Sequence, residues 1–302
     1  MEIVFGDVTL GVKDDDREYI FSYQTAGLES YRKDGKEWLC RAPKPSFWRA
    51  TTCNDRGNGF SARSSIWLGA DMFIFLDDVK IEIDGKNFAL DDVKAPKNTL
   101  LLSSSYRSAS TVSVSFIYNT ATTSEAKVVV KYTVLHGRMR VDFEYIGTKG
   151  LPELPVCGLR FIMPSLASSY DYTGLSGETY PDRMNGARKG TFHVDGLPVT
   201  PYVVPQECGM HMANSYLRIN MDNGQIIIKK ANDDFNFSLL PYTAEELENA
   251  WHQEELADAR RTVLLIAAAV RGIGGINSWG AEPEEKYHLP SDRNYKFCIY
   301  IE

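Results

Sequence analysis

Hydrophobic and polar residues alternate along much of the chain, in short runs that end at turn-forming residues. The clearest runs are 81–83 before Asp84-Gly85, 112–116, 128–134 and 140–145, with His136-Gly137 as a hairpin tip. Alternation with a period of two places every second side chain on the same face of a sheet, which is typical of half-buried strands. The spacing therefore predicts short strands joined by hairpins over residues 72–163.

The same pattern continues toward the C-terminus. Runs at 216–219 and 226–228 flank the hairpin signature Asp222-Asn223-Gly224, and the apolar runs at 263–267 and 295–300 are typical of buried strands. This succession predicts an all-β fold, a large antiparallel sandwich in which each sheet has one packed face.

A helix is predicted near residues 243–254. Thr243 and Glu246 have the spacing of a capping box, in which each side chain accepts a hydrogen bond from the other residue's backbone amide. The helix is expected to continue through His252 and to be the longest of the fold. By contrast, the polar, glycine-containing residues 54–69 predict a long surface loop.

Length and charge limit the classes of protein to consider. The 302 residues can bury a sizeable core, and we interpret 1–302 as a single domain. The net charge of -7, with dispersed Lys and Arg residues, disfavours nucleic acid or an anionic membrane as partner. No leader sequence and no apolar run of membrane-spanning length occurs, so we expect a cytoplasmic protein.

The cysteines and histidines show no metal-ligand spacing, so no metal site is predicted. Five widely spaced cysteines without a C-x-x-C pair predict reduced, mostly buried thiols. Cys53 and Cys208 lie in motif-like loops, but no histidine follows either one in an activating pattern, which disfavours a nucleophilic role.

The glycine-rich segment 272–280 contains the candidate sugar-binding residues. Its four glycines permit positive φ or close approach of a second surface, so the segment predicts a shaped loop that presents Trp279. A pyranose can stack on an indole, and Asn277 and Ser278 could supply partners for its hydroxyl groups. The local alternative is a turn whose tryptophan fills the core.

Carboxylates in the loops are the candidates for acid–base chemistry. A retaining glycosidase needs two carboxyl groups roughly 5 Å apart, which sequence spacing does not reveal. Asp55 precedes Arg56 and Asp182 precedes Arg183, an order that favours charge-assisted pairs over catalysis. We therefore assign a loop-shaping role, without catalysis, to Asp55, Arg56, Glu178, Asp182, Arg183 and Glu207.

Five motifs follow one another in a fixed order. They are Phe-Trp-Arg-Ala-Thr-Thr-Cys-Asn-Asp-Arg-Gly-Asn-Gly at 47–59, Leu-Pro-Glu-Leu-Pro-Val-Cys-Gly-Leu-Arg-Phe at 151–161, Glu-Thr-Tyr-Pro-Asp-Arg at 178–183, Thr-Pro-Tyr-Val-Val-Pro-Gln-Glu-Cys-Gly at 200–209 and Gly-Ile-Gly-Gly-Ile-Asn-Ser-Trp-Gly at 272–280. Together they resemble the C-terminal domain of the long β-galactosidases of glycoside hydrolase family 2, which is also encoded separately as the small subunit of heterodimeric β-galactosidases. The resemblance covers essentially the whole chain.

The resemblance implies a galactose mutarotase-like supersandwich that completes the site of another chain or domain. In the family, the catalytic glutamates lie on a (β/α)8 barrel, which this chain lacks, so the chain alone is expected to be inactive. Trp279 matches the tryptophan that forms one wall of the β-galactoside site. No cofactor is expected in this chain, and magnesium and sodium, where the full enzyme uses them, belong to other domains. One departure, Ala70-Asp71 in place of Ala-Gly, predicts a less mobile neighbouring loop.

Two other classes of function remain open. An aldose 1-epimerase-like enzyme would need an acid–base pair, and the candidates are His211 with Glu207 or His252 with Glu254 and Glu255. A free-standing carbohydrate-binding module would bind sugar without a partner.

Overall fold

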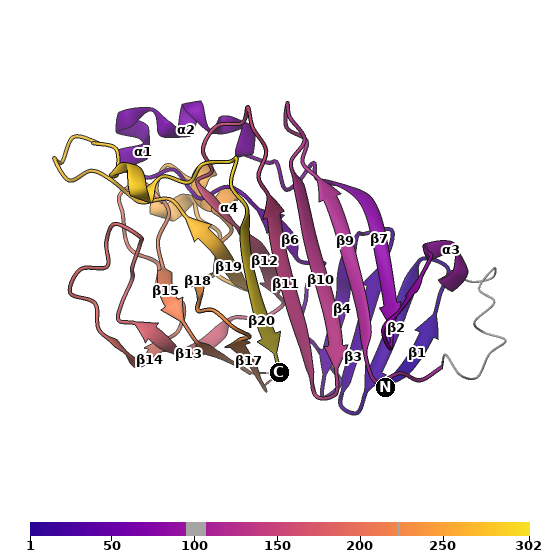
Figure 1. Cartoon of the computed structure of the whole chain (residues 1–302). Coiled ribbons are helices and arrows are strands. Elements are labelled where there is room, and N and C mark those ends of the chain that lie inside the picture. The colour runs from indigo at the N-terminus through magenta and orange to yellow at the C-terminus, as the bar shows by residue number, and fades with distance from the viewer. Residues whose placement is uncertain (95–106, 223) are drawn as a thin grey trace.

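The strands form three antiparallel sheets in a computed structural model that describes residues 1–94, 107–222 and 224–302 (Figure 1). The predicted all-β, antiparallel fold is confirmed. Each hairpin turn predicted at Asp84-Gly85 and His136-Gly137 joins two paired strands, whereas residue 223 of the predicted 222–224 turn lies outside the described residues.

The largest sheet has ten strands and runs across the whole molecule (Figure 1). In spatial order these are β14 (Lys189–Asp195), β13 (Ala167–Leu175), β16 (Tyr216–Met221), β17 (Gly224–Lys230), β20 (Tyr295–Ile301), β11 (Arg138–Ile146), β10 (Lys127–Leu135), β9 (Val112–Asn119), β7 (Phe75–Ile83) and β8 (Lys86–Phe88). Buried positions alternate with less buried ones along β10 and β11, as the period-two pattern predicts.

The described residues form two further sheets of five strands each. One consists of β1 (Glu2–Phe5), β2 (Thr9–Asp14), β3 (Arg17–Ser22), β4 (Gly27–Lys33) and β5 (Lys36–Glu37). The other consists of β15 (Met210–Asn214), β18 (Phe235–Leu240), β19 (Thr262–Val270), β12 (Val156–Met163) and β6 (Lys44–Ser46). Every residue of β12 is buried, so this strand is covered on both faces.

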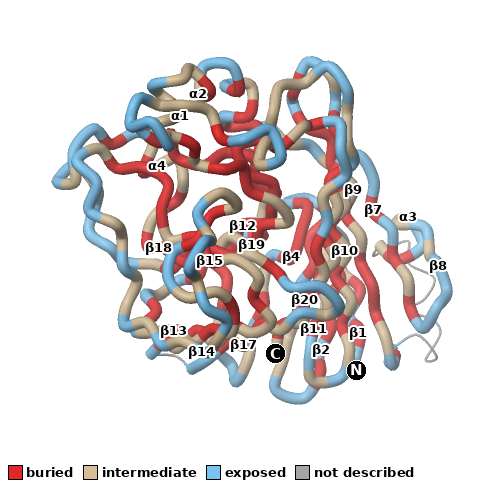
Figure 2. The backbone as a smooth tube through the Cα atoms, turned by 60° about the vertical axis from the view of Figure 1, so that its left-hand side comes forward, coloured by how far each residue is buried: buried red, intermediate tan, exposed pale blue. Residues whose placement is uncertain are grey.

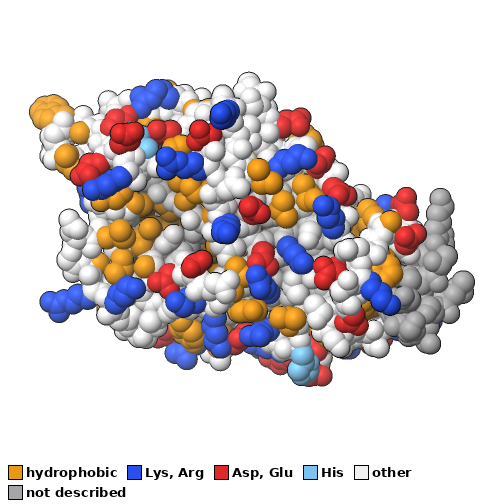
Figure 3. Space-filling view, in the orientation of Figure 1, with side chains coloured by type: hydrophobic (Ala, Val, Ile, Leu, Met, Phe, Trp, Pro, Cys, Tyr) orange, Lys and Arg blue, Asp and Glu red, His pale blue; other side chains and the backbone are white. Residues whose placement is uncertain are grey.

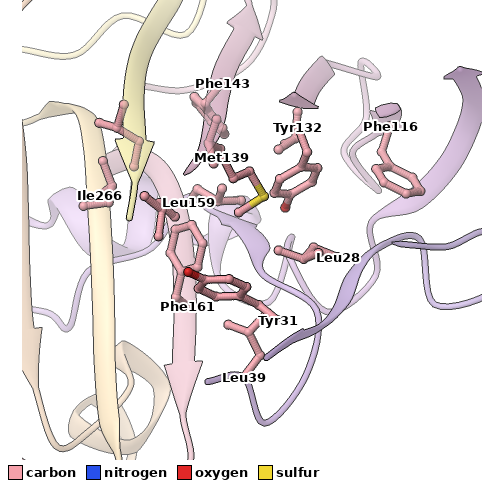
Figure 4. Packing of buried hydrophobic residues seen from close by; sticks show 14 of the residues in the cluster. Leu28, Tyr31, Leu39, Phe116, Tyr132, Met139, Phe143, Leu159, Phe161 and Ile266 are labelled. Atoms are coloured by element: carbon pink, nitrogen blue, oxygen red, sulfur yellow. The ribbon is translucent and has the colours of Figure 1, made fainter. Parts of the chain in front are cut away.

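The hydrophobic core lies where the three sheets meet. Figure 4 shows Tyr31 of β4, Met139 of β11 and Phe161 of β12 converging from one sheet each. Buried segments concentrate between the sheets, and exposed segments concentrate at the turns (Figure 2). Burial of apolar surface contributes about 25 cal/mol per Å², so this shared core couples the three sheets energetically.

The described helices are short and differ in part from the prediction. They are α1 (Cys53–Asn58), α2 (Phe60–Arg63), α3 (Leu90–Val93) and α4 (Ala244–Asn249), with 3₁₀ turns η1 (Ser65–Trp67), η4 (Gln253–Glu255) and η5 (Glu285–Tyr287). The prediction of a loop over residues 54–69 is wrong, because α1, α2 and η1 occupy most of it. Thr52 caps α1 through a capping box with Asp55, a signal that the sequence analysis missed.

The helix predicted near 243–254 begins where expected and ends early. Thr243 is the N-cap of α4, and its capping box with Glu246 is present. The helix ends at Asn249, because Ala250 has an extended backbone with ψ of 130°. His252 therefore lies outside the helix, and α4 is no longer than α1.

Candidate functional site

The glycine-rich segment 272–280 forms a hydrogen-bonded loop that projects from the end of β19 at the upper left of Figure 1. Gly274, Gly275 and Gly280 have φ values of 69°, 75° and 78°, in the left-handed region that favours glycine. The Gly275 amide donates to the Ala281 carbonyl at 2.6 Å and closes the base of the loop. The glycines are therefore required by the backbone conformation of the loop.

Asn277 and Ser278 lie at the turn of this loop. Asn277 Oδ1 accepts hydrogen bonds from the backbone amides of Trp279 at 2.9 Å and Ala281 at 3.1 Å. Ser278 is exposed and has a φ of 62°. Asn277 thus uses its side-chain oxygen to shape the turn, and Ser278 lies on the outside of the turn.

Asp182 and Arg183 contact the base of the loop from the 178–183 segment. The Asp182 carboxylate accepts hydrogen bonds from the amides of Ile273 at 2.8 Å and Gly274 at 2.7 Å. Arg183 donates to the Gly274 carbonyl and also pairs with Asp182 at 3.4 Å. Asp182 and Arg183 therefore bind the amide and the carbonyl of Gly274, respectively.

Helix α1 packs against the other side of the loop. Asn54 Nδ2 donates to the carbonyls of Ile273 at 3.3 Å and Gly274 at 3.2 Å. A Cβ atom added at Gly57 would lie 3.4 Å from the Gly280 Cα atom. Helix and loop are thus in van der Waals contact, and glycine on both sides permits the approach.

Two buried arginines lie beneath the loop. Arg49 donates to the backbone carbonyls of Arg271 at 2.6 Å and Gly272 at 3.0 Å. It also contacts both carboxylate oxygens of Asp55, at 3.0 and 3.2 Å. Arg49 therefore connects the first motif to the last, through Gly272, which is 223 residues away.

Arg271 is fully buried and is surrounded by acidic side chains. It donates to Glu153 at 3.2 Å and to Glu282. Its guanidinium carbon lies 3.8 Å from the centroid of the Phe60 ring, a cation–π geometry. A buried charge is tolerated only when it is paired, and these contacts supply the pairing.

The predicted pairing of Asp55 with Arg56 is wrong. Asp55 faces inward from α1, where it contacts Arg49 and accepts a hydrogen bond from the Thr52 amide at 3.2 Å. Consecutive residues point about 100° apart around a helix, so Arg56 faces elsewhere. The guanidinium carbon of Arg56 lies 6.0 Å from the centroid of the Trp251 ring.

Trp279 is presented to solvent and is not a core residue. Its side chain is 87% exposed, and that of the neighbouring Ile276 is 77% exposed. Figure 3 shows a hydrophobic group at the upper-left edge of the molecule, over this loop. The prediction of an exposed Trp279 is therefore correct, and the alternative of a tryptophan that fills the core is wrong.

Asp71, which stands where the resembled family has glycine, is buried. It pairs with Arg160 of β12 at 2.6 Å, and Arg160 also contacts Glu245 of α4 at 3.0 Å. This ion-paired cluster anchors the segment before β7 to two other elements, an arrangement that restrains the segment.

A cavity of about 390 Å³ opens beside the base of the glycine-rich loop. Its walls come from four of the five motifs, through Thr52, Cys53, Asn54, Glu178, Tyr180, Arg183, Tyr202, Gln206, Glu207 and Ile273. Glu207 lines it and is only 8% exposed. Burial raises the pKa of Glu207 to about 7, and Arg49 opposes that rise.

Glu178 also lines this cavity, nearer to solvent. Its carboxylate accepts a hydrogen bond from the Thr200 hydroxyl at 2.9 Å, which links the third motif to the fourth. The Gln206 side chain in turn accepts a hydrogen bond from the Cys53 amide at 2.7 Å, which links the fourth motif to α1.

The structure separates the two residues of the first candidate epimerase pair. His211 packs among aromatic rings, stacked on Phe237 at 4.9 Å and bonded to the Tyr170 hydroxyl at 3.0 Å. Burial lowers the pKa of His211 to about 4. His211 does not line the cavity that contains Glu207, so the two residues form no catalytic pair there.

The other candidates for acid–base or nucleophilic chemistry are dispersed. His252 is exposed and bonds to Glu255 at 2.8 Å, outside the cavity that contains Glu207. Burial raises the pKa of Cys208 to about 12, which removes its nucleophilic thiolate. All five cysteines are free, but Cys40 and Cys53 are exposed and Cys298 is half-buried, so the expectation of mostly buried thiols is wrong.

We expect Gly274→Ala to destabilise the chain more than Gly177→Ala. Both glycines have positive φ, 69° and 73°, so alanine is strained at each by about 1–2 kcal/mol. A Cβ atom at Gly274 would lie 2.4 Å from the Ala281 carbonyl oxygen, whereas no atom lies within 4 Å at Gly177. Overpacking should add about 1–3 kcal/mol at Gly274 alone. Equal urea-unfolding free energies for the two variants would contradict a tightly packed loop.

We expect Glu207→Gln to change the pH dependence of stability. The folded state holds the Glu207 proton more tightly than the unfolded state, so this carboxyl removes stability as pH rises from about 4.5 to 7. His211 acts in the opposite direction between about pH 4 and 6.5, because burial lowers its pKa. Without the carboxyl, the free energy of unfolding should rise with pH by about 3 kcal/mol more than in the wild type. Parallel pH profiles from denaturant titrations would contradict this assignment.

The sequence matches the family model described as beta galactosidase small chain over residues 13–301. The chain belongs to this family. The β-galactosidase small subunit of Latilactobacillus sakei is 50% identical to it, in an alignment that covers 99% of this chain and 97% of that protein. The predicted identity as a β-galactosidase small-chain unit is thus confirmed.

Longer relatives contain the same unit. The β-galactosidases of Halalkalibacterium halodurans and Streptococcus thermophilus are 34% and 30% identical over all of this chain, which spans 28% of each of those proteins. A solved galactose mutarotase-like protein from Lactobacillus casei aligns with 97% of this chain at 8% identity and a TM-score of 0.43, a level from which nothing about activity follows.

Arg49 and Arg271 are the site residues that sequence reasoning missed. Arg49 stands in the first motif after Phe47-Trp48, and Arg271 directly follows the apolar strand β19. An arginine at the edge of an otherwise apolar run is a signal for a buried ion pair, because an unpaired charge is costly there. That signal could have indicated both residues but not their partners.

Proposed function

We propose that this chain is the small subunit of a β-galactosidase and completes the substrate site of a large chain. In this proposal the large chain carries the (β/α)8 barrel and the catalytic carboxylates, and the glycine-rich loop reaches over the barrel mouth. Trp279 forms an apolar wall against which the galactoside ring stacks. The observation that carries the proposal is a nearly fully exposed tryptophan on a loop fixed by Asp182, Asn54 and Arg49.

The rigidity of the loop supports a positioning role. Ordering a flexible loop on binding costs conformational entropy, whereas a preorganised loop avoids that cost. The loop carbonyls and amides are already engaged by the surrounding motifs. Its exposed apolar tip is therefore available for a partner or a substrate without rearrangement of the base.

Further exposed apolar side chains at the same end of the molecule support a protein partner. Leu68, Met72 and Phe73 lie between η1 and β7, and Phe75 is the first residue of β7. Clustered exposed apolar residues are typical of protein interfaces. The longer relatives, in which this unit makes up 28% of the chain, indicate that the partner is the remainder of a β-galactosidase.

Reconstitution tests the proposal. We expect the purified chain alone to leave a nitrophenyl β-galactoside intact, the large chain alone to have little activity, and the mixture to hydrolyse it. Galactoside hydrolysis by the isolated chain that a single carboxylate substitution abolishes would refute the accessory role. Acceleration of α-galactose mutarotation, followed by polarimetry, would instead support an epimerase.

The proposal includes no cofactor in this chain and a cytoplasmic location. Five free cysteines support a reducing compartment. Within the described residues, none of the helices has the length and apolar character needed to cross a membrane.

A further inference from the structure

The cavity beside the glycine-rich loop has the size and construction of a ligand site. Its volume of about 390 Å³ lies at the lower end of the range of about 300–1,000 Å³ that is typical of small-molecule sites. Four segments that are far apart in the sequence build it, and hydrogen bonds between them hold its walls in place. Trp279 is not among its lining residues.

The buried floor of the cavity is polar and incompletely hydrogen-bonded. Among the described residues, the hydrogen bond to the Glu207 side chain comes from the Tyr180 hydroxyl at 3.4 Å, which is long. A carboxylate offers about four lone-pair positions, so Glu207 retains acceptor capacity inside the cavity. Glu207 can therefore accept further hydrogen bonds from a molecule that occupies the cavity.

The remaining walls offer donors as well as acceptors, because the Gln206 amide group and the Tyr202 hydroxyl line the cavity. Arg183 and the Asn54 amide group direct their N–H bonds to the carbonyls of the loop. Glu178 adds a second carboxylate at the wall. A ligand with several hydroxyl groups, each of which donates and accepts, matches this lining.

The rim supplies an aromatic and an aliphatic surface. Tyr202 is 38% exposed, and its backbone carbonyl accepts a hydrogen bond from Gln253 at 2.6 Å, which holds this part of the rim. Ile273 contributes from the base of the loop. An aromatic face above buried acceptors matches the two faces of a sugar ring, which has apolar C–H groups and hydroxyl donors.

We propose that this cavity is a second carbohydrate site, which binds one neutral pyranose unit independently of Trp279. Glu207 and Glu178 accept hydrogen bonds from the sugar hydroxyls, and the Tyr202 ring covers its C–H face. The site goes beyond the proposed subunit function, because it lies wholly within this chain. Its occupation needs no large chain.

The reactivity of Cys53 reports directly on whether the cavity is occupied. It lines the cavity and is exposed, whereas Cys40 is exposed and does not line the cavity. We expect galactose or glucose to slow alkylation of Cys53 by iodoacetamide at least tenfold at saturation and to leave Cys40 unchanged, as measured by mass spectrometry of the full chain. Equal rates with and without sugar, or equal slowing at both cysteines, would overturn the proposal.

Three variants locate the binding. Protein-detected NMR titrations with the same sugars should give saturable shifts in the wild type and in Trp279→Ala. Affinity should fall at least tenfold in Glu207→Gln and in Tyr202→Ala, and the second variant keeps the test open if the first does not fold. Binding lost only in Trp279→Ala would assign the sugar to the loop tip and would overturn the cavity site. Because these titrations use the isolated chain, their outcome is separate from that of the reconstitution.

Discussion

Replacing Trp279 with alanine should lower kcat/KM of the reconstituted enzyme for β-galactosides by about 5- to 30-fold. The estimate follows from the loss of a stacking contact worth about 1–2 kcal/mol, where each 1.4 kcal/mol is a factor of ten. If Trp279 contacts the substrate and the transition state equally, the substitution should raise KM and leave kcat unchanged. A lower kcat would show that part of the contact forms only in the transition state.

Trp279→Ala should leave the stability of the chain almost unchanged. With 87% of its side chain exposed, Trp279 buries little surface, so we expect a stability change within about 0.5 kcal/mol. Emptying a core aromatic site costs about 3–5 kcal/mol instead. Trp251→Ala is the matched control, since this tryptophan is 67% exposed and lies outside the loop. If Trp279→Ala instead lowers the melting temperature strongly, and the remaining complex has an unchanged kcat/KM, Trp279 contributes to packing and not to substrate binding.

The periodicity of the sequence was sufficient to predict several strands and the antiparallel class of the fold. The runs at 128–134 and 140–145 became the centres of β10 and β11, because alternation with a period of two has one stable arrangement when one face is buried. Local signals also predicted the start of α4, since a capping box depends only on residues three positions apart. The start of α1 has the same kind of local signal, the capping box of Thr52 and Asp55, and could have been predicted from it. The end of α4 depends on packing against distant elements, which no local signal contains.

The candidate site was predictable only in part for the same reason. The glycine spacing indicated a shaped loop and left two possibilities for Trp279. Which carboxylate meets which arginine is a tertiary fact: Asp55 pairs with Arg49, six residues away, and not with its neighbour Arg56. The contact between Arg49 and the carbonyls of Arg271 and Gly272 spans more than two hundred residues. It cannot be predicted from local sequence patterns.

Replacing Arg49 with methionine should destabilise the chain by about 3–5 kcal/mol. The change removes the guanidinium from a site where Asp55 and the carbonyls of Arg271 and Gly272 are buried, and it leaves these acceptors without their donor. Methionine keeps much of the side-chain volume, so the expected loss reports the missing charge and hydrogen bonds more than a cavity. Denaturant unfolding of the purified chain measures it.

Two further variants separate the causes of that loss. Arg140→Met removes a similar arginine from a similar pair, with Asp142 at 2.7 Å, but on a partly exposed strand surface, so it should cost at most about 1 kcal/mol. The double variant Arg49→Met/Asp55→Asn retains a capping oxygen on α1 and removes a buried carboxylate whose remaining cationic neighbour is Arg271 at 3.8 Å, so it should be more stable than Arg49→Met alone. If the double variant is no more stable, the lost bonds to the two loop carbonyls account for the whole effect, and Arg49 acts chiefly by holding the loop that presents Trp279. If Arg49→Met and Arg140→Met cost the same, the buried pair has no special role, and the rigidity of the loop must come from Asp182 and Asn54.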